Sequence, residues 1–523
     1  MQGTFALSRL ITRHAVEGAH GVVAAQSRLA AEIGAGVLTK GGNAVDAAIA
    51  TSFALGVIEP WNSGIGGFGC LLAQAPGGGR AEGVDFGPLA PAGLDPALYP
   101  LRQEGGGDLF GWPAVEGDRN LEGPSSWCAP TYLQGLGLAH ERLGSLPWAE
   151  LVAPAVELAE AGLEVDWYAS LLIGTAAQAL YRHPTSAARF LKDGFPPAPA
   201  WSGESASMPL PELAATLRLV RDEGWRTLLN GTLKGRFLDD VRGLGGNIGE
   251  RDLLDGSARP VSPLVGSYRK MTVATMPGLF GGITLQAALR RLEGRAIGGG
   301  DLPDADAYAA YADALASAFA ERIETLGDVA GDPPDPGCTS HLSVIDAEGG
   351  MVALTQTLLS PFGSKVLLPE TGILMNNGIM WFDPEPGRPN SMAPAKRPLA
   401  NMCPVLATGP DANLALGASG GRRILPALLQ ILSFLTDHFM PIEEALAQPR
   451  LDVAGDGLVT LDARLADEVA DRLGPRYRLR RLKPLTYPLL FACPTAVLED
   501  RADGRRYGMA EPMHPWADAV AED

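Results

Sequence analysis

The segment GCTSHLSVID, residues 337–346, decides how this chain is interpreted. It follows GDVAGDPPDPGC (327–338), whose Gly, Pro and Asp residues favour turns and exclude a helix or a central strand. HLSVID (341–346) and MVALTQTLL (351–359) have the composition of β-strands, and the four residues between them fit a hairpin. Thr339 is therefore predicted to stand at the start of a strand, directly after a turn-rich segment.

A threonine in this position has a possible chemical use. Its hydroxyl is a weak nucleophile unless a base lies nearby. If the Cys338–Thr339 peptide bond is cut, the new α-amino group, with a pKa of about 7.7–8, can serve as that base. Taken alone, a threonine at a strand start more often has a structural role, because threonine favours strands. The sequence around Thr339, however, favours a catalytic role for this threonine.

The string CTSHLSVID resembles the T-T-H-x-S-V-x-D processing motif of the γ-glutamyltransferase (glutathione hydrolase) family, with Ser340 in the second position. Further stretches resemble that family in the same order, and the resemblance spans residues 22 to about 450. They are AAEIGAGVLTKGGNAVDAAIATSFALGVIEPWNSGIGG (30–67), GPSSWCAPTYLQGL (123–136), MPGLFGGITL (276–285), NMCPVLA (401–407) and GASGGRRI (417–424). The chain is identified as a member of this family of N-terminal nucleophile (Ntn) hydrolases.

The resemblance implies an α+β fold, a four-layer αββα sandwich. It implies that Thr339 is the nucleophile, that Thr357 is the second threonine supporting it, and that the backbone N–H groups of Gly420 and Gly421 form the oxyanion hole. It also implies that self-cleavage between Cys338 and Thr339 yields a large subunit, 1–338, and a small catalytic subunit, 339–523, both parts of one αββα unit.

The family's pocket binds the α-carboxylate and α-ammonium of a γ-glutamyl group, and here the sequence departs from the pattern. The departures share the loss of a polar or charged side chain: Gly87 replaces an arginine, Leu359 an asparagine, Gly378 a glutamine, Trp381 an acidic residue, and Ala400-Asn401 a serine pair. A charged amino-acid end placed against Leu359 and Trp381 would lose water without gaining partners, which is costly.

We therefore expect the catalytic residues of the family to be retained, and we expect a different, more apolar substrate pocket. The candidate substrate contacts are His341, Leu359, Trp381 and Asn401; the candidate walls also include Phe382 and Trp61 or Trp112; and the candidate anion contacts are Arg397, Arg422 and Arg119. An arginine belongs more often to a structural or surface ion pair than to an anion-binding site. For His341, packing within the strand is as good an explanation as contact with the substrate. Such departures resemble the non-glutamyl branches of the family, such as the oxamate amidohydrolases and the cephalosporin (glutaryl) acylases.

Helices are expected on both sides of Thr339. Residues 29–57 predict an alanine-rich, buried helical segment broken at GGNA (41–44), with Asn43 as the cap of its second half. Residues 130–190 look helical, with Pro147 and Pro154 near helix starts. Residues 303–327 predict a further helix.

Composition limits the partners. A formal net charge of −18 opposes binding to nucleic acid. Five dispersed cysteines without a CxxC pair, and seven histidines without ligand spacing, predict neither a disulfide framework nor a metal site, and no cofactor is predicted. The N-terminus lacks a signal peptide and no run of about 18 apolar residues occurs, so we expect a cytoplasmic protein that does not bind membranes.

The sequence thus predicts a self-processing threonine amidohydrolase or acylase that cleaves a small non-glutamyl amide through an acyl-enzyme. A homo-oligomer of the two-subunit units is compatible with it. The alternatives are a true γ-glutamyltransferase with a relocated pocket, and an unprocessed member without catalysis. Nucleotide binding by SGIGGFG (63–69) is disfavoured, because this glycine string follows a helix, whereas a dinucleotide fingerprint follows a strand.

Overall fold

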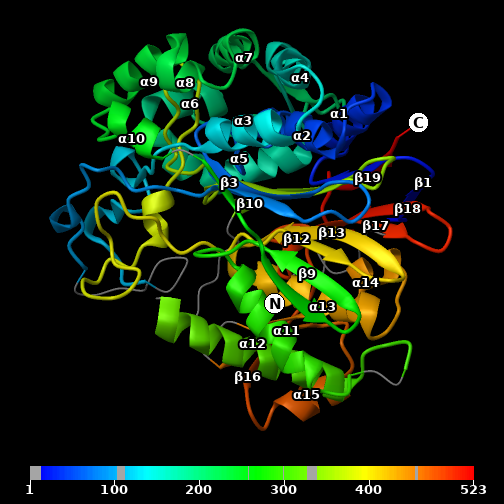
Figure 1. Ribbon diagram of the computed structural model, residues 1–523. Helices are drawn as coiled ribbons and strands as arrows, with labels where there is room; N and C mark the ends of the chain where they lie inside the picture. The colour runs from blue at the N-terminus through cyan, green and yellow to red at the C-terminus, as the bar shows by residue number, and fades with distance from the viewer. Residues whose placement is uncertain are drawn as a thin grey trace.

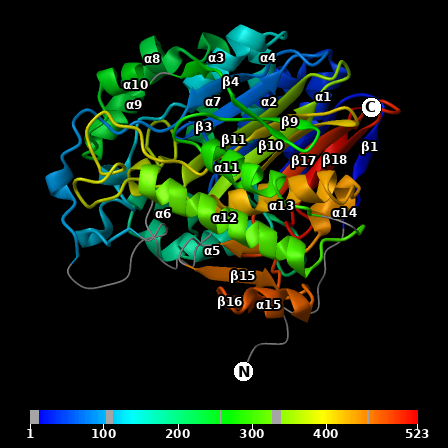
Figure 2. The same ribbon diagram turned by 60° about the horizontal axis from the view of Figure 1, so that its bottom comes forward.

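The computed structural model describes residues 13–102, 112–256, 258–297, 300–326, 338–453 and 457–522. Within these ranges two seven-stranded sheets lie face to face, and helices cover the outer side of each (Figure 1). The predicted four-layer αββα sandwich is therefore confirmed. Figure 2 shows the strands of both sheets running side by side beneath the helices.

The sheet that carries Thr339 is called the β10 sheet here, and its strands pair antiparallel throughout. Its order is β19 (Asp518–Ala521), β2 (Val22–Ala25), β10 (Cys338–Ile345), β11 (Met351–Leu359), β3 (Phe68–Gln74), β4 (Glu82–Phe86) and β7 (Arg259–Val261).

The other sheet, called the β13 sheet, is also antiparallel. Its order is β1 (Val16–Gly18), β18 (Arg506–Ala510), β17 (Cys493–Asp500), β13 (Ala412–Ser419), β12 (Val405–Thr408), β9 (Met271–Thr275) and β8 (Leu264–Tyr268). Smaller sheets join β5 (Leu163–Val165) with β6 (Ala206–Met208), and β14 (Leu451–Val453), β15 (Leu458–Asp462) and β16 (Arg478–Leu482).

Two groups of helices close the sandwich. Those packed on the β10 sheet side are α1 (Arg28–Thr39), α2 (Ala44–Ile58), α3 (Tyr132–Leu143), α4 (Trp148–Ala161), α5 (Trp167–Tyr181), α6 (Pro184–Phe190), α7 (Pro211–Glu223), α8 (Thr227–Asn230), α9 (Thr232–Gly243) and α10 (Glu250–Asp255). Those on the β13 sheet side are α11 (Gly282–Glu293), α12 (Ala305–Leu326), α13 (Ile424–Thr436), α14 (Ile442–Ala447) and α15 (Asp467–Leu473). No helix in the described ranges is long and apolar enough to span a membrane.

Strands of the β10 sheet are apolar on both faces because both faces are covered. In β11, Val352 and Leu354 pack toward the helices, whereas Met351 and Ala353 pack toward the β13 sheet. Successive side chains of a strand point to opposite faces, so a strand buried on both sides reads as a continuous apolar run. This explains why MVALTQTLL shows no alternation in the sequence.

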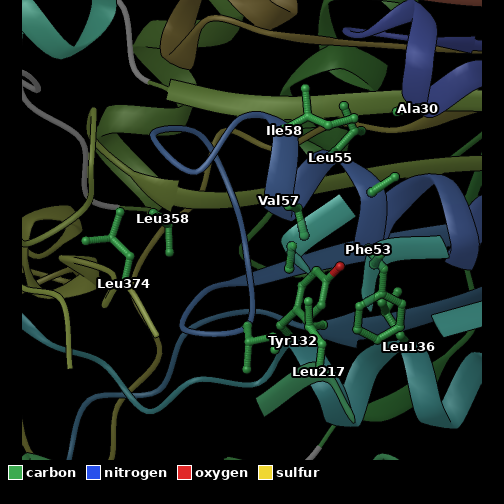
Figure 3. Packing of buried hydrophobic residues seen from close by; sticks show 14 of the residues in the cluster. Ala30, Phe53, Leu55, Val57, Ile58, Tyr132, Leu136, Leu217, Leu358 and Leu374 are labelled. Atoms are coloured by element: carbon green, nitrogen blue, oxygen red, sulfur yellow. The ribbon is translucent and has the colours of Figure 1, made fainter. Parts of the chain in front are cut away.

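The helical predictions are largely confirmed. The GGNA break separates α1 from α2, and Asn43 caps α2 in a reciprocal capping box with Asp46. Phe53 of α2 meets the ring of Tyr132 edge-on at 5.5 Å in the core above the β10 sheet (Figure 3). Residues 130–190 divide into α3, α4, α5 and α6, and the helix predicted at 303–327 is α12.

One prediction about a proline is wrong. Pro147 does precede α4, but Pro154 lies inside it. A proline inside a helix removes one backbone hydrogen bond. Leu151 and Val152 before it and Val156 after it are all buried, so packing of this face against its neighbours overrides the local preference.

The glycine string 63–69 connects α2 to β3 and has a packing role. A side chain at Gly66 would place its Cβ 2.2 Å from the carbonyl oxygen of Leu374, and one at Gly67 would place it 2.5 Å from the carbonyl oxygen of Thr357. These glycines therefore let two backbones approach closely. That close approach fixes the loop against the end of β11, where Thr357 lies.

Candidate active site

Thr339 lies near the start of β10, in the middle of the β10 sheet. The register between β10 and β11 shifts here: Cys338 pairs with Leu359 and Ser340 with Gln356, so Thr339 stands opposite two residues of β11, Thr357 and Leu358. The extra residue therefore belongs to β11, and such an irregularity bends that strand and redirects its side chains beside Thr339. The predicted scissile bond joins Cys338 to Thr339, both within β10, and residues 327–337 before it lie outside the described residues.

The hydroxyl of Thr339 is buried beside that of Thr357. Thr339 Oγ1 donates a hydrogen bond to Thr357 Oγ1 at 3.4 Å, and the side chains are 5% and 1% exposed. Thr357 Oγ1 also accepts the backbone N–H of Leu359 at 2.8 Å. The second threonine is thereby held at the position from which it can orient the first.

A glycine turn from the other sheet meets Thr339. β13 ends at Ser419, and a short turn through Gly420 and Gly421 leads into α13. Gly420 has φ 131° and Gly421 has φ 60°, a region that favours glycine. Gly420 and Thr339 line the same cavity, so this turn brings the end of β13 to the cavity that Thr339 lines.

The cavity at Thr339 is formed by segments far apart in the sequence. Its walls are mostly aromatic and apolar, with a few polar side chains. The residues that line it are Gln26, Trp61, Asn62, Tyr168, Leu172, Thr339, Ser419, Gly420, Tyr487, Leu489, Cys493 and His514. Of the predicted walls, Trp61 lines this cavity, whereas Trp112, Trp381 and Phe382 lie elsewhere.

Leu359 and Trp381 belong to the apolar cluster between the sheets, together with Phe68 and Trp112. The rings of Phe68 and Trp381 are 5.2 Å apart. At Gly378 a Cβ would lie 2.7 Å from Cys128 Sγ. Leu359 and Trp381, which stand at positions that the resemblance assigns to substrate contact, are therefore buried among packed apolar side chains and do not line the cavity at Thr339.

Asn401 and His341 also lie outside the lining of the cavity. Asn401 accepts a hydrogen bond from the buried Arg322 at 3.4 Å. His341 contacts Thr355 at 2.8 Å, and its ring leaves no room for a side chain on Gly417 of the facing sheet. Burial lowers the pKa of His341 to about 3, so the ring is neutral, and it lies between the two sheets against Gly417. Contact of either residue with substrate stays a prediction.

None of the three candidate arginines lines the cavity either. Arg397 donates to the carbonyl of Gly87 at 2.6 Å and lies 3.9 Å from Asp85. Arg119 donates to the carbonyl of Leu98 at 3.2 Å. Arg422 lies in the turn that opens α13, where its charge acts on Asp452.

A buried polar group next to the cavity was missed by sequence reasoning. Glu59 is fully buried at the end of α2, and its Oε2 accepts from Ser340 Oγ and from Asn62 Nδ2, each at 3.2 Å. Its Oε1 lies 3.8 Å from His514 Nε2. Burial raises the pKa of Glu59 to about 8. The signal was a single acidic residue inside the apolar run GVIEPW.

His514 is neutral, and its tautomer follows from its contacts. Nδ1 accepts the backbone N–H groups of Trp516 and Ala517, at 3.2 and 2.9 Å, so the ring proton resides on Nε2. Nε2 lies 3.2 Å from the hydroxyl of Tyr168. Burial lowers the pKa of His514 to about 3, and the charge of Arg13 lowers it further.

Residues 417–421, GASGG, also fit the G-x-S-x-G pattern of serine hydrolases, which sequence reasoning overlooked. The hydroxyl of Ser419 accepts a hydrogen bond from Gln26. Nε2 of His514 faces Tyr168 and Glu59 instead, so a Ser–His pair is not formed within the described residues. Among those residues, too, no group of three His, Cys, Asp or Glu side chains is arranged to hold a metal ion.

Comparison with known proteins shows the family to which the chain belongs. The model of the family described as Gamma-glutamyltranspeptidase matches residues 30–334 and 329–484. The Acylase ACY 1 proenzyme of Pseudomonas sp. (strain SE83) is 33% identical over 495 residues, which cover 87% of this chain and 86% of that protein. The Glutathione hydrolase proenzyme of Bacillus subtilis (strain 168) is 29% identical over 487 residues, covering 83% and 81%.

Two solved structures resemble this fold. The crystal structure of cephalosporin acylase from Bacillus halodurans has a TM-score of 0.84 at 24% identity, and covers 100% of this chain and 99% of that chain. The Helicobacter pylori gamma-glutamyltranspeptidase has a TM-score of 0.51 at 27% identity, covering 58% and 82%. The cephalosporin acylase likeness establishes the layered architecture and not the substrate.

Proposed function

Because this chain belongs to the gamma-glutamyltranspeptidase family of Ntn hydrolases, and is thus an amide hydrolase or acyltransferase, we propose that it cuts itself before Thr339 and uses that residue to cleave a small non-glutamyl amide. The observation that carries the proposal is that Thr339 bonds Thr357 and lines one cavity with Gly420. These three residues come from both sheets and occupy the positions that the family resemblance assigns to nucleophile, supporting threonine and oxyanion hole.

Cleavage before Thr339 would leave two chains that stay together. β10 lies between β2 of the first part and β11, and β11 in turn pairs with β3 of the first part. In the β13 sheet, β12 pairs with β9. In both sheets, backbone hydrogen bonds between paired strands therefore join residues 1–338 to residues 339–523. The two products would stay together as one folded unit.

The proposed reaction has two halves. Thr339 Oγ attacks the carbonyl carbon of the amide while the α-amino group takes the hydroxyl proton. The C–N bond breaks, the amine leaves with that proton, and an ester joins the acyl group to Thr339. Water then attacks the ester and releases the acid, while the hydroxyl regains a proton. The turn at Gly420 and Gly421 would donate backbone N–H groups to the oxyanion.

A non-glutamyl substrate is supported by the closed γ-glutamyl position. The side chains of Leu359 and Trp381 are 2% and 5% exposed and pack within the intersheet cluster. A zwitterionic amino-acid end would have to displace this packing and would find neither the arginine nor the acidic residue of the family pattern. The relatives named acylase are consistent with such a substrate.

The test begins with denaturing gels of the purified full chain. We expect two fragments, and we expect Thr339→Ala to remain a single band without hydrolytic activity, while Thr339→Ser retains part of both functions. Cleavage of the Thr339→Ala variant into the same fragments would refute Thr339 as the processing nucleophile. Turnover of a γ-glutamyl chromogenic amide at ordinary family rates would refute the non-glutamyl assignment and favour a true γ-glutamyltransferase.

A further inference from the structure

The cavity at Thr339 is small. Its volume is about 50 Å³. At roughly 10–15 Å³ for each water-sized particle, this space holds about three to five non-hydrogen atoms. Its larger side-chain walls are Trp61, Tyr168, Leu172, Tyr487 and Leu489.

The cavity offers no cation to a substrate. None of the described residues that line it is Lys, Arg, Asp or Glu, and His514 is held neutral by burial. The arginines behind the walls are already engaged. Arg13 donates to the carbonyls of His514 and Pro515 and lies 3.3 Å from Asp518. A carboxylate entering this cavity would lose its water without gaining a charged partner.

A second such arginine, Arg450, is paired with Glu511 at 2.5 Å, and both side chains are buried. A carboxyl group also lies behind the wall: Glu59 accepts a hydrogen bond from the wall residue Asn62. If ionised, Glu59 would add negative charge behind the wall and would repel an anionic substrate further.

Two polar atoms at the walls have no hydrogen-bond partner. The indole nitrogen of Trp61 is a donor and Oε1 of Gln26 is an acceptor, and both residues are 1% exposed. Both atoms are buried, so neither adds a charge to the walls of the cavity.

We propose that this cavity receives the acyl group of the substrate, and that this acyl group is short and uncharged, with about four carbon atoms. The inference rests on the proposed role of Thr339 as nucleophile, because only then does the acyl carbon lie at the cavity mouth. It excludes the γ-glutamyl group and also glutaryl, which ends in a carboxylate.

The experiment compares p-nitroanilides that differ in the acyl group alone: butanoyl, hexanoyl, glutaryl and γ-glutamyl. Hexanoyl and glutaryl are similar in length, so their ratio measures the effect of charge. We expect kcat/KM to be about 10-fold lower for hexanoyl than for butanoyl, because two methylenes exceed the space. We expect it to be about 100-fold lower for glutaryl than for hexanoyl.

A matched pair of variants on α5 tests whether this cavity is the acyl site. Leu172 lines it and is 5% exposed, whereas its neighbour Leu171 is 41% exposed and lies outside the lining. Leu172→Ala removes three carbon atoms from the wall, so the hexanoyl-to-butanoyl ratio should rise about 10-fold. Leu171→Ala should leave the ratio unchanged.

Each result of these assays bears on either the acyl group or the role of Thr339. An enzyme that cleaves itself but prefers glutaryl or γ-glutamyl, or hydrolyses none of the uncharged amides, overturns the inference and leaves self-processing intact. An unchanged ratio in Leu172→Ala places the acyl group elsewhere and overturns it too. If Thr339→Ala hydrolyses butanoyl p-nitroanilide as well as the wild-type chain does, the proposed function itself fails.

Discussion

Replacing Glu59 by glutamine should change how the stability of the protein depends on pH. Glu59 is fully buried, and burial raises the pKa of its carboxyl from 4.5 to about 8 although Asn62 and Ser340 donate hydrogen bonds to it. Between pH 4.5 and 8 the unfolded chain releases this proton while the folded chain keeps it. The contribution of Glu59 to stability is therefore fully present below pH 4.5 and is lost as pH rises through 8.

The magnitude follows from the size of the shift. One pKa unit corresponds to about 1.4 kcal/mol, so the shift accounts for roughly 5 kcal/mol between the two limits. A chain of this length has an unfolding entropy near 1.1 kcal/mol/K, so the difference in Tm amounts to about 4 °C. The neighbouring His514 does not titrate in this range, because burial lowers its pKa to about 3.

The assay is thermal unfolding of Glu59→Gln against its parent from pH 5 to pH 9. Both chains carry Thr339→Ala, so that differences in cleavage do not enter. The amide can keep the acceptor for Ser340 and Asn62, and any constant cost of the substitution appears equally at every pH. We expect the variant to gain about 4 °C relative to its parent between pH 5 and pH 9.

The control is Glu157→Gln, which changes an exposed carboxyl on α4 and should give a difference that does not vary with pH. A flat difference for Glu59→Gln as well would refute the reasoning, because the buried carboxyl would then not titrate between these limits. A variant that loses stability relative to its parent as pH rises would show that Glu59 is ionised in the folded protein.

Two further substitutions address the geometry around Thr339. Thr357→Val removes the oxygen that accepts the Thr339 hydroxyl while keeping the shape, so kcat of the p-nitroanilide assay should fall about 10–100-fold, and Thr357→Ser should restore most of it. Gly420→Ala should lower kcat by at least about 100-fold and also lower Tm, because φ is 131° and the new Cβ would lie 2.9 Å from Ala492 Cα. Its control, Gly235→Ala on α9, meets no atom within 4 Å and should leave activity unchanged; a Gly420→Ala enzyme as active as this control would contradict the role of the turn.

The parts of the fold that could be predicted are those whose signals are local. The strands on either side of the hairpin, the GGNA break and the Asn43 cap each follow from a few adjacent residues, because turn and cap chemistry acts over that distance. The layered arrangement followed from the family resemblance. The position of Pro154 was not predictable in this way, since the packing of α4 decides it.

The cavity could not be predicted, because its walls come from segments hundreds of residues apart. Trp61 lies far before Thr339 in the sequence, and His514 belongs to the segment before β19. Trp381 was expected at the substrate for its place in a motif. Its ring instead packs against Phe68, and a motif position does not reveal which way an aromatic side chain turns when its neighbours have also become apolar.

The backbone around Thr357 explains how residues that contact the substrate can change while the reaction stays the same. Leu359 stands where the family pattern has an asparagine, and its φ of 87° lies in a region that asparagine tolerates and leucine adopts at a cost of about 1–3 kcal/mol. Its N–H nevertheless donates to Thr357 Oγ1 at 2.8 Å, so the strained conformation preserves a contact to the hydroxyl that accepts from Thr339. The side chain at this position can therefore change from polar to apolar while the backbone N–H still donates to Thr357 Oγ1. Gly420 contributes through its backbone in the same way. Since Leu359 and Gly420 would act through main-chain atoms, side chains around the acyl group can change without moving Thr339 or Thr357, and membership in the family fixes the reaction more firmly than it fixes the acyl group.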